Sequence, residues 1–218
     1  MSKKKLTNVE LLELYAMALR NVETQNEIKE IMADLGYDEV VIQEGKDILS
    51  RTKEAYDFMN TEEDETSEAY EVFSRKKEQL NTVYTLHRKK AKVIFRNEPL
   101  ILEKLGLSHA IGRSYSKWIT QVKEFYNKVA QDTELQTRLE RLKITAEDIT
   151  NTAALLTDVE TAKFDYHQEK GESQSATKAK DEAFDTLNDW MSEFYAVARI
   201  GLEENPQLLE SIGKFVRS

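Results

Sequence analysis

The chain of 218 residues contains only seven glycines and two prolines, while one third of its residues are charged. This composition is typical of long helices with few connections, so we predict an all-α fold. The net charge of −9 opposes general binding to nucleic acid, and the absence of cysteine excludes disulfides, thiolate nucleophiles and sulfur-ligated metal sites.

The N-terminal residues MSKKKLTNVE are basic at the start but lack the apolar run of a secretory signal. No apolar stretch in the sequence approaches the roughly 18 residues that a membrane-spanning helix needs. We therefore expect a soluble, cytoplasmic protein with no membrane partner.

Apolar periodicity and helix-boundary residues predict five helices in the first half of the chain. The first begins at Thr7, which can form a capping box with Glu10. The polar stretch NTEEDETSE separates two long amphipathic runs and predicts the turn of an antiparallel αα-hairpin. The predicted helices cover about 7–22, 25–35, 38–59, 67–96 and 99–105.

The end of the first half returns near the C-terminus, where NEPLILEKLG (97–106) is matched by ENPQLLESIG (204–213). This match pairs Gly106 with Gly213, an offset of +107 in the numbering, which we call the repeat register. Carried along the whole chain without a gap, it gives sixteen identities in 111 pairs. Such a level could also arise from shared apolar periodicity without common descent. We nevertheless predict a tandem duplication, with residues 1–110 as copy one and 111–218 as copy two.

Matched helix-start residues support the same register. Thr7 pairs with Ser114, and Asp38 pairs with Thr145, so each copy has a capping residue before the same two helices. In copy two the stretch HQEKGESQS (167–175) stands where copy one has its predicted turn. We expect two long αα-hairpins related by an approximate two-fold axis, packed as a four-helix bundle with flanking short helices and forming one domain.

No catalytic or metal-binding pattern is present in the sequence. Ferritin-like bundles use Glu-x-x-His pairs, but the residues three before the histidines are Tyr84, Gly106 and Phe164. The acidic run at 62–65 lacks the ligand spacing and mid-loop glycine of an EF-hand. We predict no catalytic residues, no metal and no cofactor.

Basic residues concentrate on the second long helix of copy one. Three of them recur at helical spacing beside an asparagine and are expected to share one face. One interpretation is a docking stripe for an acidic protein or a phosphate-bearing ligand, and the other is a solvated face whose cations pair with nearby glutamates. The predicted partner-binding residues are Lys77, Asn81, Arg88 and Lys92.

Two functional hypotheses follow. The first is a non-enzymatic cytoplasmic helical protein that acts as an interaction or assembly component, through a protein partner or self-association. The alternative is a small-molecule-binding bundle with a pocket between the two copies, where Tyr84, His87 and Trp190 converge. His87 aligns with Phe194 of copy two, so it could equally be a hydrogen-bonded core residue. Whether the aromatic residues of copy two form core or interface stays open.

Overall fold

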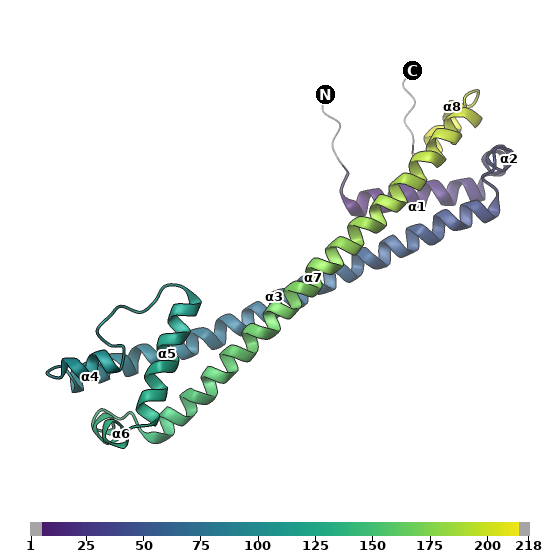
Figure 1. The fold of residues 1–218 in the computed structure, drawn as a ribbon. Coiled ribbons are helices and arrows are strands. Elements are labelled where there is room, and N and C mark those ends of the chain that lie inside the picture. The colour runs from purple at the N-terminus through teal and green to yellow at the C-terminus, as the bar shows by residue number, and fades with distance from the viewer. Residues whose placement is uncertain (1–5, 214–218) are drawn as a thin grey trace. The chain divides into compact units, whose positions relative to one another are not determined.

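The computed structural model describes residues 6–213, in which every regular element is an α-helix (Figure 1). The predicted all-α fold is therefore confirmed. None of the described helices is both long enough and apolar enough to cross a membrane. The helices are α1 (Asn8–Thr24), α2 (Asn26–Asp34), α3 (Glu39–Ile94), α4 (Pro99–Lys104), α5 (Tyr115–Ala130), α6 (Thr133–Glu140), α7 (Ala146–Gly201) and α8 (Pro206–Ser211).

The predicted capping residues stand at the helix starts. Thr7 and Glu10 form the capping box of α1, in which the Thr7 backbone N–H donates to the Glu10 carboxylate at 2.8 Å. Ser114 accepts from a backbone N–H in the first turn of α5. Asp38 accepts from the backbone N–H of Val40 at 2.9 Å, ahead of α3. Each cap satisfies donors that the first turn of a helix leaves without an intrahelical partner.

The predicted hairpin turns are wrong. Residues 60–68 lie inside α3 and residues 167–175 lie inside α7, and each of these helices runs through 56 residues without interruption (Figure 1). Neither stretch contains proline, and their glutamates, glutamines and lysines are good helix formers. The buried row also continues through the polar stretch of α3, from Met59 to Glu62 and on to Phe73. High polarity there reflects solvent exposure rather than a chain reversal.

The chain divides into two compact units that cut across the predicted copies. Unit 1 comprises residues 1–64 and 171–218, and unit 2 comprises residues 65–170. Each unit therefore takes residues from both halves of the sequence, and α3 and α7 each contribute one segment to each unit.

In unit 1, the first segment of α3 packs antiparallel to the last segment of α7. The Thr52 hydroxyl donates to the Ala183 carbonyl at 3.2 Å, and the ring of Trp190 lies against Gly45. A Cβ at Gly45 would lie 2.6 Å from Cζ2 of Trp190, so this approach requires glycine. The largest buried side chains of the unit 1 core are Leu19, Ile28, Met32 and Phe194.

In unit 2, the second segment of α3 packs antiparallel to the first segment of α7. Phe73 and Tyr166 stack with ring centroids 6.3 Å apart, and Lys76 pairs with Asp158 at 3.4 Å. Helices α4, α5 and α6 pack over these segments of α3 and α7. The largest buried side chains of the unit 2 core are Tyr84, Phe95, Phe125, Leu80, Leu105, Leu107, Leu139 and Ile144.

Candidate functional site

Arg88, predicted to lie on an exposed docking stripe, is buried in unit 2 with only 5% of its surface exposed. Its guanidinium donates to the carbonyls of Gly106 at 2.8 Å, Leu107 at 3.3 Å and His109, and to the Tyr84 hydroxyl at 3.3 Å. A fork of five donors suits several carbonyls at once, so Arg88 fixes the chain that follows α4. The expectation that Arg88 faces solvent is wrong.

Lys77 and Asn81 also serve unit 2 internally, at the contact between α3 and α5. The Asn81 carboxamide oxygen accepts from the Trp118 indole N–H at 3.1 Å. The Lys77 ammonium lies 6.0 Å from the centroid of the same ring, at the outer limit of a cation–π contact. Lys92 alone among the four predicted residues is exposed. The four residues therefore do not form one exposed face.

The three residues of the predicted pocket belong to different units. Tyr84 and His87 belong to unit 2, whereas Trp190 belongs to unit 1, where it stacks on Phe194 and meets the edge of Tyr37. Tyr84 is fully buried among the aromatic rings of unit 2. Neither unit gathers this trio into a site.

His87 is a buried residue at one end of a hydrogen-bond chain. Its Nδ1 lies 2.9 Å from the Tyr126 hydroxyl, which is hydrogen-bonded to Thr152, and the Thr152 hydroxyl donates to the Asp148 carbonyl at 2.7 Å. This chain links α3, α5 and α7 within unit 2, and a neutral imidazole can complete it as donor or as acceptor.

The environment of His87 favours this neutral form. Burial lowers the pKa of His87, and the nearby Asp148 carboxylate only partly opposes that effect. The same burial raises the pKa of the Tyr126 phenol. His87, Asp148 and Thr152 also line a small cavity of about 230 Å³.

An exposed row of apolar side chains on α3 was missed by the sequence reasoning. Leu86 and Val93 are 50% and 54% exposed and lie seven residues apart, and the exposed Val72 lies fourteen residues before Leu86, with the polar Gln79 between them. Lysines and an arginine flank the row on the same surface of unit 2. We call this surface the α3 stripe, which consists of Val72, Arg75, Gln79, Thr82, Leu86, Lys89, Lys92 and Val93, all exposed.

The α3 stripe is basic, and part of it lines a groove. Its charged members are cations, while Glu78 borders it as an exposed acid. A shallow groove of about 530 Å³ lies along the part of the stripe that contains Arg75, Gln79 and Thr82. The seven-residue spacing of Leu86 and Val93 places these two side chains on the same face of α3. Scattered exposed leucines need no explanation, but a periodic row does. The groove is lined by Arg75, Glu78, Gln79, Thr82 and Val83.

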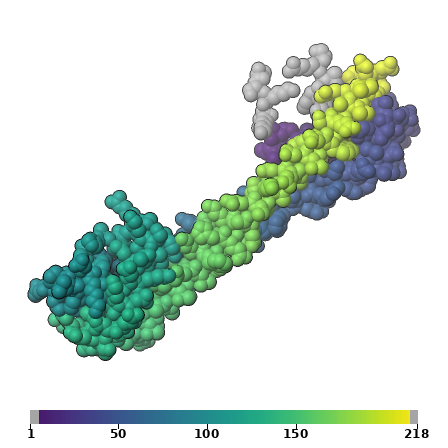
Figure 2. All heavy atoms as spheres, viewed as in Figure 1, coloured from purple at the N-terminus to yellow at the C-terminus, as the bar shows by residue number. Residues whose placement is uncertain are grey.

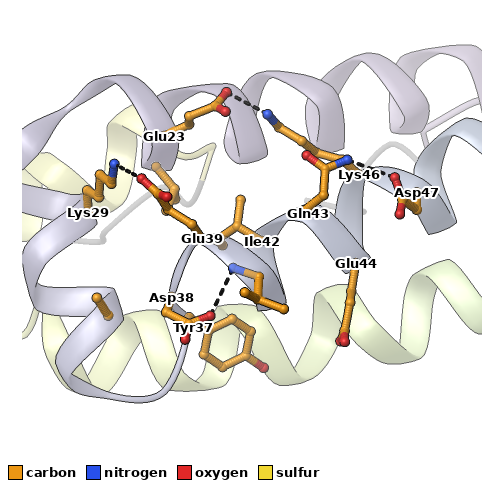
Figure 3. A pocket seen from close by; sticks show the side chains of 13 residues that line it. Glu23, Lys29, Tyr37, Asp38, Glu39, Ile42, Gln43, Glu44, Lys46 and Asp47 are labelled. Carbon is orange, nitrogen blue, oxygen red and sulfur yellow. Dashed lines mark hydrogen bonds and ion pairs between the residues drawn. The ribbon is translucent and has the colours of Figure 1, made fainter.

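A second feature is a charged cleft of about 910 Å³ in unit 1, formed by α1, α2 and the start of α3 (Figure 3). Figure 3 shows two ion pairs across it: Lys46 with Glu23 at 2.6 Å, and Lys29 with Glu39. These pairs lower the pKa of the Glu23 carboxyl and raise the pKa of the Lys29 ammonium. Both lysines of the lining are thus paired within the protein, and the remaining charges of the lining are the carboxylates of Asp38, Glu44 and Asp47.

The equivalent positions of unit 2 lack these charges. In the repeat register, Glu23, Glu39, Lys46 and Asp47 are each replaced by alanine, at positions 130, 146, 153 and 154. These four charges of the cleft are therefore particular to unit 1. In comparisons with known proteins, no protein family, no curated protein and no solved structure matches this chain.

Proposed function

We propose that this protein is a non-enzymatic, cytoplasmic helical protein that acts as an interaction or assembly component, and that the α3 stripe is its contact surface. The observation that carries the proposal is the exposure of Val72, Leu86 and Val93 along one face of α3, beside the basic residues of the stripe. Covering this row with a helix removes apolar surface from water.

The flanking charges define the partner's chemistry. Arg75, Lys89 and Lys92 extend from the same surface as the apolar row, so a partner with carboxylates beside its own apolar residues fits best. Such charges mainly set partner choice and association rate, while the apolar row supplies the contact area. The partner expected from the stripe is an amphipathic, acidic helix.

The test compares a stripe variant with a matched control. Leu86→Asp with Val93→Asp places two carboxylates in the row, and Phe164→Asp changes a more exposed apolar residue of unit 2 on another helix. After cross-linking in the source cells, the stripe variant should lose the proteins recovered with the wild type, and the control should keep them. Unchanged recovery with the stripe variant, at an unchanged melting temperature, overturns the proposal.

We also infer that the chain is a tandem duplication in the repeat register, although its long helices are not hairpins. The starts of α5, α6, α7 and α8, at 115, 133, 146 and 206, are the exact equivalents of those of α1, α2, α3 and α4, at 8, 26, 39 and 99. Among residues 6–213 the left-handed positions pair in the same way, Gly36 with Lys143 and Gly106 with Gly213. Helix boundaries and backbone conformation thus support common descent more strongly than sixteen identities do.

A second candidate function is the binding of a small molecule in the cleft of unit 1. The specific observation in its favour is the charged lining, in which both lysines are already paired and three further carboxylates remain. Asp38 also caps α3 and Asp47 accepts from the Gln43 amide, but both keep a negative charge that no cation of the lining offsets. Such a lining suits a ligand that carries a cationic group. Binding would raise the melting temperature with ligand concentration, and Asp47→Ala, the residue found at position 154 in the other half, should weaken that effect.

A further inference from the structure

Helix α7 carries a second exposed face, in unit 1, at positions largely equivalent to the α3 stripe. All of its members are exposed, and Ile200 reaches 69%. The atoms of the later part of α7, light green in Figure 2, lie at the surface with nothing in front of them. We call this surface the α7 face, which consists of Ala179, Glu182, Asp185, Thr186, Asp189, Glu193, Ala196 and Ile200.

The α7 face has the opposite charge to the α3 stripe. Lys178 pairs with Glu182 at 3.6 Å from beside the face, but both side chains are largely exposed, so this pair competes only weakly with another cation. Arg199, the equivalent of Lys92, borders the face at one end as an exposed cation. One surface of the chain is therefore mainly basic and apolar, and the other is mainly acidic. The charged members of the face are Glu182, Asp185, Asp189 and Glu193.

The two surfaces also match in length and in the order of their residues. Val72 to Val93 and Ala179 to Ile200 each cover the same number of helical residues, so each spans about 30 Å. An antiparallel alignment places Leu86 opposite Thr186 and Val93 opposite Ala179. The same alignment brings Lys89 level with Glu182 and Asp185. A parallel alignment instead places Leu86 opposite Glu193. The Glu193 carboxylate would then lose water to an apolar side chain, which is unfavourable.

We propose that the α3 stripe of one copy of this protein docks antiparallel on the α7 face of a second copy. The inference rests on the proposed function of the stripe as a contact surface, and it names the partner as the chain itself. Because the two surfaces differ, the interface is heterologous, and a copy bound through its stripe still presents an α7 face. The contact depends on charge attraction between exposed groups, so salt weakens it.

The first experiment measures association by sedimentation velocity at several protein concentrations, in low and high salt. The sedimentation coefficient of the wild type should rise with protein concentration in low salt, and this rise should disappear in high salt. The stripe variant Lys89→Glu with Lys92→Glu and the face variant Glu182→Lys with Asp185→Lys should each stay monomeric. Mixing the two variants should restore association, because the intact α7 face of one meets the intact stripe of the other.

The outcomes separate this inference from the proposed function. A wild type that stays monomeric at every concentration overturns self-docking, and so does a mixture of the two variants that stays monomeric. If Leu86→Asp with Val93→Asp still loses its cellular partners in that case, the proposed function stands with a different acidic partner. If no cellular partner depends on the stripe, both fail.

The second experiment tests the alignment and uses the absence of native cysteine. Val93→Cys protein mixed with Ala179→Cys protein should form an intermolecular disulfide under mild oxidation, since Cα atoms in disulfides lie about 4.4–6.8 Å apart. The matched control is Val93→Cys mixed with Ile200→Cys, which an antiparallel contact keeps at opposite ends. Equal cross-linking in both mixtures, or in the control alone, overturns the antiparallel docking.

Discussion

Arg88 and Tyr195, which are equivalent positions in the repeat register, hold the chain after the corresponding short helix in their two units. Arg88 donates to the carbonyls that follow α4, at 2.8 Å from the Gly106 oxygen, and Tyr195 donates to the carbonyl of Ile212 after α8 at 3.1 Å. A guanidinium and a phenol thus perform the same task at equivalent positions. The difference lies in how many carbonyls each can satisfy.

Removing these donors should therefore destabilise the protein unequally. Arg88→Met removes the donor from one buried and two partly buried carbonyls, at a cost of about 3 kcal/mol in the free energy of unfolding. Tyr195→Phe removes the hydrogen bond to the Ile212 carbonyl and should cost about 1 kcal/mol. Urea unfolding of the variants measures both. Arg96→Met, an exposed change close to Arg88 in sequence, is the control and should have little effect. Equal stability of Arg88→Met and Arg96→Met would contradict the assignment.

Arg88 also shows why the sequence misplaced part of the candidate site. Long basic side chains are usually exposed, and only the carbonyls after α4, from residues 18 to 21 positions away, make its burial favourable. Those partners depend on tertiary structure, which helical spacing does not reveal. Lys77 and Asn81 were misplaced for the same reason, since their partner Trp118 lies on α5.

The helix starts were predictable because capping is local. Thr7, Asp38, Ser114 and Thr145 interact with donors only two or three residues away, so the sequence contains both partners. The continuity of α3 and α7 was not predictable from polarity, because a solvated helix and a solvated turn have similar composition. The seven-residue spacing of Leu86 and Val93 was visible in the sequence, but only the structure shows that these side chains are exposed.

The neutral, buried His87 predicts a specific pH dependence of stability. Its pKa in the folded state is lowered by burial below the ordinary value of 6.5, so the unfolded state binds the proton more readily. The contribution of His87 is complete above pH 6.5 and is lost as the pH falls through the folded-state pKa. Two charged groups act on the imidazole: Asp148 raises its pKa and Lys90 lowers it. The neutral Tyr126 hydroxyl contacts its Nδ1.

The check uses His87→Phe, which introduces the residue found at the equivalent position 194. Urea unfolding at pH 7.5 and at successively lower pH gives the free energy of unfolding of both proteins. The difference between wild type and variant should shift in favour of the variant as the pH falls, because the variant has no imidazole to protonate. A difference that is constant with pH would show that His87 does not titrate in this way.

Two glycines inside the long helices should respond to alanine in opposite directions. A Cβ at Gly45 meets the Trp190 ring at 2.6 Å from Cζ2, so Gly45→Ala should destabilise unit 1 by about 1–3 kcal/mol through overpacking. A Cβ at Gly171 meets nothing within 4 Å, so Gly171→Ala should stabilise α7 by about 0.5–1 kcal/mol. Thermal and urea unfolding measure both changes. Stabilisation by Gly45→Ala would mean that Trp190 does not pack closely there.

Unit 2 is a continuous segment of the chain with its own core, so residues 65–170 should fold alone. The fragment keeps the buried cluster around Tyr84, Phe95 and Phe125, together with Arg88 and the carbonyls that it holds. We expect a helical circular dichroism spectrum and one cooperative unfolding transition. The control fragment 111–170 lacks α4 and the α3 segment, which leaves Phe125 and Trp118 without their partners, and it should not unfold cooperatively. Loss of cooperativity in the longer fragment would show that unit 2 depends on the rest of the chain for its stability.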